Sequence, residues 1–401
     1  MKRFALAAVT AQGIQAAVSF VLQILVLRLL GVSDYGRFAI LYGVIVLAMA
    51  VISGLVGDSL VVLHREQHRI RAALELMTLW TSLGAAIISA GIALLTGFVD
   101  AVEAAVFGLA LLLFSVMEVV RRLLVAHLRF LRAAMGDVIG LVCALAVVLP
   151  FWHGSGLALW TFLAAMAVGQ AVAILVGWRM LPREERSLVR PGSPDLGAVW
   201  RYGSWRALQQ TLRPGLFTVV RMLVQAFAGI AAVGLLEAAR TYVSPLTLVV
   251  GSFSSLLFVR FAERAKAGGR GSLREADRVV LLLLLLSVVL GGVALVLAPV
   301  VGPLVFDIHL DQVSVISWVA YGMSIAMVTP YGALSAVSGR QMVVFLIRLG
   351  DTVLGIVLTA LALALGAPFE VAPFLLAIAS LLGGIGLRIV AARGEAESQG
   401  T

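Results

Sequence analysis

The sequence has little charge and almost no cysteine. Only 13% of its 401 residues are charged, whereas an ordinary soluble domain carries roughly 25%. The one cysteine, Cys143, lies inside an apolar run, so a disulfide framework and a cysteine-based metal site are both excluded. We expect Cys143 to pack as a small apolar side chain.

Motifs typical of enzymes and nucleotide-binding proteins are also missing. The sequence contains no HExxH, no CxxC and no GxxxxGK[ST], and no carboxylate pair at a plausible catalytic site. His64 and His68 have the spacing of two helical metal ligands, but further ligands are lacking nearby, so we interpret them as a solvated loop end. These absences predict a protein that is not an enzyme and has no metal or cofactor.

Apolar residues are what the sequence has in excess. They make up 61% of the chain, and the mean hydropathy is +1.07. A membrane-spanning helix needs about twenty mostly apolar residues. Runs of this length lie at roughly 4–27, 38–62, 72–98, 102–126, 134–152, 157–180, 200–228, 234–260, 279–301, 312–336, 341–365 and 370–391. We therefore predict an all-α polytopic membrane protein with about twelve transmembrane helices.

The net charge of +9 is spread over the loops between these runs, which favours a bilayer topology over nucleic-acid binding. Counted from a cytoplasmic N-terminus, the even-numbered loops hold most of the arginines. The odd-numbered loops are acidic or nearly uncharged, apart from Arg28 and Arg37 in the first. This pattern predicts a multi-pass protein of the plasma membrane, the inner membrane of a bacterium, with the N-terminus and the C-terminus in the cytoplasm.

The longest polar connection falls near the middle of the chain. It contains Pro182, Pro191 and Pro194 and predicts a cytoplasmic linker, 182–199, between an N-terminal six-helix lobe, 1–181, and a C-terminal six-helix lobe, 200–401. A repeat supports the division, because Gly31 and Gly229 are equivalent at an offset of 229 − 31 = 198. Two halves with an even number of spans would be related by an axis along the membrane normal.

Two spans carry a polar stripe. Gln12, Gln15 and Gln23 share one face of the first span, and the offset of 198 places them on Gln210, Arg213 and Arg221 of the seventh. An arginine at membrane depth costs at least about 2.5 kcal/mol, so it is expected to face a bundle interior or a water-filled cavity. The predicted substrate-binding residues are therefore Arg213, Arg221, Arg206, Gln12, Gln15, Gln23, Gln210 and Gln225.

Three alternatives stay open for these residues. Arg206 can extend to the cytoplasmic interface, Arg213 and Arg221 can do the same or pair with a carboxylate, and the glutamines can join helices to one another. The sign of the charge separates substrate classes. Glu118, Glu237 and Asp351 each have an arginine at helical spacing, so the unpaired charge at depth is expected to be positive and to suit an anion.

One loop carries a family resemblance. The segment Leu27-Arg-Leu-Leu-Gly-Val-Ser-Asp-Tyr-Gly-Arg-Phe-Ala39 resembles the corresponding loop of Wzx-type polysaccharide flippases, and 232–242 resembles the matching second-half segment. The resemblance implies the multidrug/oligosaccharidyl-lipid/polysaccharide (MOP) flippase superfamily and a V-shaped, MATE-like bundle that works by alternating access. It also implies that cavity arginines bind anionic parts of the substrate, which fits Arg213 and Arg221 by position, with Arg28 as an addition.

The implied substrate is a polyprenyl-pyrophosphate-linked oligosaccharide, moved from the cytoplasmic to the outer leaflet for surface polysaccharide biosynthesis. The implied partners are this lipid-linked oligosaccharide, membrane lipids, H⁺ or Na⁺ as a coupling ion, and other polysaccharide-assembly proteins. Without a nucleotide-binding motif, transport would draw on an ion gradient, the membrane potential or the substrate's own gradient.

Two other functions remain open. A multidrug antiporter of the same superfamily would need a titratable carboxylate deep in one lobe, for which Asp58 is the nearest candidate. A membrane glycosyltransferase or polymerase acting on the same lipid would be expected to carry long outer loops, and all outer loops here are short.

Overall fold

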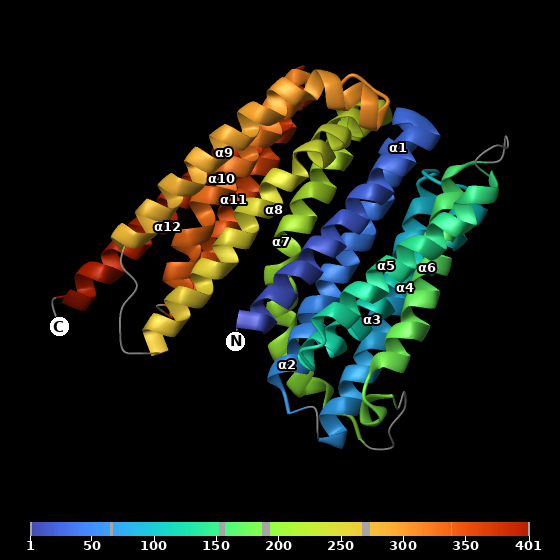
Figure 1. The fold of residues 1–401 in the computed structure, drawn as a ribbon, viewed down its shortest axis with the longest axis horizontal. Coiled ribbons are helices and arrows are strands. Elements are labelled where there is room, and N and C mark those ends of the chain that lie inside the picture. The colour runs from blue at the N-terminus through green and yellow to red at the C-terminus, as the bar shows by residue number, and fades with distance from the viewer. Residues whose placement is uncertain are drawn as a thin grey trace. The chain divides into compact units, whose positions relative to one another are not determined.

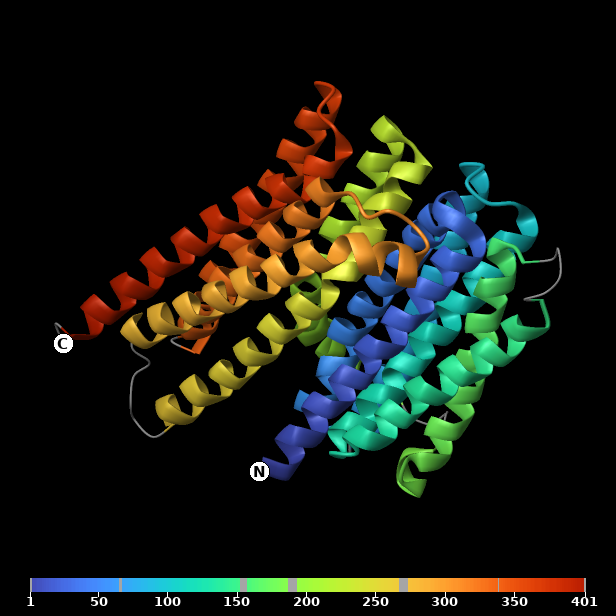
Figure 2. The same ribbon diagram turned by 45° about the horizontal axis from the view of Figure 1, so that its top comes forward.

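The computed structural model describes residues 2–64, 67–151, 157–186, 193–266, 273–337 and 339–399. The chain forms two compact units, of which unit 1 ends at Thr218 and unit 2 begins at Val219. Figures 1 and 2 show the helices of the two units.

The first helix of unit 1, α1 (Lys2–Ile52), contains both of the first two predicted spans. Gly31 lies inside it with a non-helical backbone, φ 80° and ψ 177°. The hydroxyls of Ser19 and Tyr42 lie 3.2 Å apart, although 23 residues of straight helix would separate them by about 35 Å. The chain therefore reverses at Gly31, as the blue ribbon of Figure 1 shows.

The other helices of unit 1 follow from the predicted spans. A π-helical turn, η1, separates α1 from the short α2, and the first part of α7 completes the unit. The bounds are η1 (Ser53–Gly57), α2 (Asp58–Val62), α3 (His68–Leu95), α4 (Ala101–Ala126), α5 (Phe130–Val148), α6 (Leu159–Met180) and α7 (Leu196–Ala228). α4 is central, because it packs against α1, α3, α5 and α6.

Unit 2 repeats this arrangement six spans later. Its helices run side by side in both views (Figures 1 and 2) and are α8 (Ile230–Lys266), α9 (Leu273–Val301), α10 (Gln312–Val337), α11 (Gln341–Ala364) and α12 (Ala372–Gln399). α10 packs on α9 and α12 as α4 packs on α3 and α6, and α11 packs on α12 as α5 packs on α6. Gly229 joins α7 to α8 with φ +89°, at the position predicted to match Gly31. Two pseudo-symmetric sets of helices are thus present.

Ten helices of the described chain are long and apolar enough to cross a membrane. One of them contains the two spans that reverse at Gly31. α7 has 33 residues, about 50 Å of helix, but it is not among the ten because polar residues interrupt it. The prediction of an all-α polytopic membrane protein is confirmed.

The boundary between the two units lies within a helix. α7 begins at Leu196, inside the predicted linker 182–199, and the boundary between the units falls at Thr218, within that helix. Residues 187–192 of the linker lie outside the described residues. The lobes 1–181 and 200–401 stay a prediction.

The backbones of α7 and η1 come into direct contact. A Cβ on Gly203 would lie 2.9 Å from the Cα of Leu55, and one on Gly54 would lie 2.7 Å from the carbonyl carbon of Arg206. Both distances are shorter than van der Waals contact, and the opposing atoms are backbone, which cannot rotate away. Glycine at these positions therefore sets how closely α7 packs on η1.

Gly203→Ala tests this contact. We expect it to destabilise the protein by about 1–3 kcal/mol, the usual cost of overpacking, because the new methyl group meets the Leu55 backbone. Thermal unfolding in detergent measures the change. Gly84→Ala is the matched control, since a Cβ on Gly84 meets nothing within 4 Å; equal melting temperatures of the two variants would contradict the close approach.

Candidate functional site

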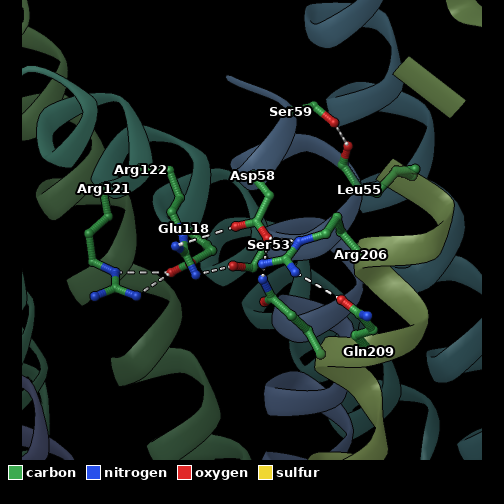
Figure 3. A network of polar contacts seen from close by, with 10 residues as sticks. Ser53, Leu55, Asp58, Ser59, Glu118, Arg121, Arg122, Arg206 and Gln209 are labelled. Carbon is green, nitrogen blue, oxygen red and sulfur yellow. Dashed lines mark hydrogen bonds and ion pairs between the residues drawn. The ribbon is translucent and has the colours of Figure 1, made fainter. Parts of the chain in front are cut away.

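A network of polar side chains surrounds the π-helical turn η1 in unit 1 (Figure 3). Asp58, the first residue of α2, lies at its centre. Its Oδ2 atom accepts hydrogen bonds from Arg206 Nε at 2.7 Å and from Gln210 Nε2 at 3.0 Å. Arg122 of α4 approaches the other oxygen to 3.9 Å. One carboxylate therefore joins α2 to α4 and to the first half of α7.

Glu118 of α4 holds the other side of the network. Arg121 and Arg122 donate to its carboxylate from Nε at 3.0 and 2.8 Å, and the Glu118 side chain is only 3% exposed. Arg122 also donates to the hydroxyl of Ser53, and Arg121 donates to Gln15 Oε1 at 2.8 Å. The network thus extends from α7 through α2 and α4 to α1.

The local sequence explains why the network forms at η1. All five residues of this turn are buried, and π-helical turns inside α-helices occur frequently at functional sites. A Cβ on Gly57 would lie 3.0 Å from Cγ of Arg122, so the glycine leaves room for the arginine stem. Asp58 follows at once, with its backbone N–H bonded to the carbonyl of Ser53. The turn thereby places the carboxylate beside Arg122.

A second cluster lies in unit 2. Glu237 accepts from Arg221 Nη2 at 3.0 Å and from Arg240 Nε at 2.7 Å. The side chains of Arg221 and Glu237 are 7% and 3% exposed. The pair crosses the turn at Gly229, because Arg221 stands eight residues before it and Glu237 eight residues after it.

The expectation that the deep cations lack carboxylate partners is wrong for two of them. Arg206 pairs with Asp58, and Arg221 pairs with Glu237. Neither partner stands at helical spacing from its arginine, so the spacing pattern does not predict the pairs. Asp58 is 148 residues from Arg206, and Glu237 lies across the turn at Gly229 from Arg221.

Arg213 and Arg28 differ from these two arginines. Both are exposed. Arg213 lies over the ring of Phe217, with its guanidinium carbon 5.7 Å from the ring centroid. Within the described ranges neither arginine has a carboxylate partner. They are the predicted site residues whose charge stays uncompensated.

The predicted glutamines separate into two groups. Gln15 and Gln210 belong to the network around Asp58, and Gln23 accepts a hydrogen bond from the hydroxyl of Tyr35 at 3.4 Å. Gln12 is exposed and Gln225 is half-buried, and in the part of the chain that the structure describes neither side chain has a hydrogen bond. The structure thus joins Gln15, Gln210 and Arg206 in one place, while Arg221 belongs to the cluster of unit 2.

Sequence reasoning did not predict Ser53 or the π-helical turn, and it placed Gln209 in the polar stripe of the seventh span without assigning it to the site. Gln209 accepts from Arg206 Nη1 at 2.8 Å, and it precedes the predicted Gln210 directly. A signal for the turn was available in the two glycines that flank Leu55 and Val56 in an otherwise apolar run. In the described residues, no group of three or more His, Cys, Asp or Glu side chains could hold a metal ion.

Comparison with known proteins identifies the fold. No family model and no curated protein matches the sequence. Among solved structures, the inward-facing conformation of a MATE family multidrug resistance transporter of the MOP superfamily aligns with a TM-score of 0.73 at 14% identity, covering 96% of both chains.

The chain has the MATE transporter fold. The outward-facing conformation of such a multidrug resistance transporter aligns with a TM-score of 0.67 at 13% identity, over 100% of this chain and 96% of the other. A MOP superfamily transporter from Pyrococcus furiosus aligns with a TM-score of 0.66 at 13% identity, over 98% and 95%. The MATE fold agrees with the predicted superfamily architecture, whereas the Wzx-type resemblance stays a prediction.

Glu237→Gln tests the cluster of unit 2. We expect a loss of about 3–5 kcal/mol in unfolding free energy, because removing one partner of a buried pair leaves the other charge uncompensated. Asp34→Asn is the control: Asp34 is 42% exposed and 3.5 Å from Arg37, so its loss should cost about 0–1 kcal/mol. Chemical unfolding in detergent measures both, and a Glu237→Gln protein as stable as the control would refute a stabilising role for the pair.

Proposed function

We propose that the protein is a membrane transporter that works by alternating access, with multidrug antiport as its activity. The observation that carries this proposal is the MATE fold over nearly the whole chain, since the structures that share it include multidrug resistance transporters in inward-facing and outward-facing conformations. Antiport draws on an ion gradient, which is one of the driving forces that remain for a sequence without a nucleotide-binding motif.

Asp58 is the residue we propose to couple the ion to the substrate. Its side chain is 14% exposed and is bound by donors from α4 and α7. Neutralising this carboxylate by H⁺, or screening it by Na⁺, would weaken its hold on Arg206 and Gln210. Binding of one ion would then change the contact between α2 and the first half of α7, which supports coupling between ion and substrate.

A dye-efflux assay tests the antiporter proposal. In cells without their own efflux pumps, expression of the protein should lower the accumulation of a cationic dye, and Asp58→Asn should abolish this effect because asparagine has no negative charge with which to bind a cation. Asp34→Asn, an exposed acidic residue outside the network, should leave efflux intact. Equal efflux by wild type and Asp58→Asn, at equal membrane levels, would reject Asp58 as the coupling residue.

A second candidate is the flippase for a polyprenyl-pyrophosphate-linked oligosaccharide. Two observations support it: Arg213 and Arg28 carry charges with no carboxylate partner among the described residues, and the loop 27–39 resembles that of Wzx-type flippases. For the Pyrococcus furiosus transporter, a binding pocket of reversed polarity suggests a different function. A cationic site in this chain would suit pyrophosphate.

Export of surface polysaccharide distinguishes the flippase from the antiporter. If the flippase proposal holds, Arg213→Ala should abolish export while the protein still inserts, because the anionic head of the substrate loses its ligand. Arg278→Ala, also exposed but on α9 of unit 2, is the matched control. Normal export by Arg213→Ala together with dye efflux by the wild type would select the antiporter. A cytoplasmic location of both termini is part of either proposal.

A further inference from the structure

Five arginines gather where α6 ends and α5 begins, in unit 1. We call them the arginine cluster: Arg129, Arg132, Arg179, Arg183 and Arg186. Arg129 directly precedes the span Phe130–Phe151, and Arg179 stands one residue before the end of the span Leu159–Met180. The cluster therefore lies at the membrane boundary, where head groups of one leaflet are within reach.

Three of these guanidinium groups are held by backbone carbonyls instead of carboxylates. Arg129 donates to the carbonyl of Met180, and Arg132 Nη1 reaches the same oxygen at 3.4 Å. Arg186 donates to the carbonyls of Arg179 and Leu181 at 2.6 and 3.1 Å. A guanidinium has five N–H donors, so most donors of Arg129 and Arg132 remain available.

The five arginines of the cluster outnumber the two carboxylates that stand among them in the sequence, Glu184 and Glu185. The end of a helix supplies only about half an elementary negative charge, against three guanidinium groups bound to it. Glu185 pairs with Arg71 at 3.3 Å, and its other carboxylate oxygen lies 3.8 Å from His127 Nε2. In the described ranges no carboxylate pairs with any arginine of the cluster.

The hydrogen bonds of Arg129, Arg132 and Arg186 cap the end of α6 and use only part of their donors. The backbone also brings Arg129 close to the end of α6. Leu128 takes a left-handed conformation, φ +58°, in the short turn before α5, and the next residue, Arg129, donates to the carbonyl of Met180. Leu128 and Leu131 are 55% and 53% exposed and flank the arginines. Apolar side chains beside a cationic patch favour a ligand that has both an anionic head and an acyl chain.

We propose that the arginine cluster binds the phosphate of an anionic phospholipid, with Leu128 and Leu131 against its acyl chains. A phosphodiester accepts bidentate hydrogen bonds from guanidinium groups, and basic pockets between transmembrane helices are known to bind anionic head groups. The site lies apart from the Asp58 network and does not depend on which substrate the protein transports.

Lipid titration of the purified full-length protein tests the site. Phosphatidylglycerol or cardiolipin is added from mixed detergent micelles, and bound lipid is counted by native mass spectrometry. The triple variant Arg129→Gln, Arg132→Gln, Arg186→Gln should bind these lipids about a hundredfold more weakly. Glutamine still donates to the α6 carbonyls, so the fold is expected to persist. Arg274→Gln with Arg278→Gln, two exposed arginines of unit 2, should bind as wild type.

Further arms distinguish the sources of phosphate. Phosphatidylcholine should not bind at the cluster, and inorganic phosphate or glycerol phosphate should not displace the anionic lipid. Displacement by inorganic phosphate at similar concentration would overturn the lipid assignment. Unchanged lipid binding by the triple variant would overturn the site itself. If the triple variant does not fold, a variant with lysine at the same three positions keeps the positive charge but cannot donate two parallel hydrogen bonds to one phosphate. It should bind the anionic lipids about tenfold more weakly than wild type. Binding equal to wild type would then reject bidentate recognition.

Discussion

A charge inside a bilayer has no water to solvate it, and this constraint organises the polar interior of both units. In unit 1 the buried Glu118 lies between Arg121 and Arg122, and in unit 2 the buried Glu237 lies between Arg221 and Arg240. Each carboxylate permits two arginines to stay close to the helix bundle. The net charge of each cluster is then reduced to about one, and in unit 1 the side chains of Gln15 and Ser53 accept further hydrogen bonds from these arginines.

The same constraint, that buried polar groups need partners, applies to the single helix α7. Its polar residues keep it below the hydropathy of the other spans, yet several of them have polar partners. Arg206 and Gln210 contact Asp58, Arg221 contacts Glu237, and the hydroxyl of Thr218 donates to the carbonyl of Gly43 at 3.3 Å. The close contact of Gly203 with Leu55 brings Arg206 and Gln210 within reach of Asp58. A polar helix is therefore stable here because its neighbours supply the acceptors.

Much of the fold was predictable because it depends on features that repeat along the sequence. The apolar runs predicted the spans, and the offset of 198 residues predicted that Gly31 and Gly229 are equivalent. The pairing of Asp58 with Arg206 was not predictable, since it joins residues 148 positions apart and depends on the packing of α7 against η1. The pairing of Arg221 with Glu237 was accessible in principle, because the two stand at equal distances from the turn at Gly229. The pattern i, i+3 alone had assigned Glu237 to Arg240.

The reversal at Gly229 also has a consequence for biosynthesis. Arg221 and Glu237 are only 16 residues apart, so both leave the ribosome within the same helical hairpin. They can meet before the hairpin leaves the insertion machinery, and the arginine then enters the lipid as half of a neutral pair instead of as a bare cation. The tight turn thus allows a buried charge to be inserted without waiting for any later part of the chain.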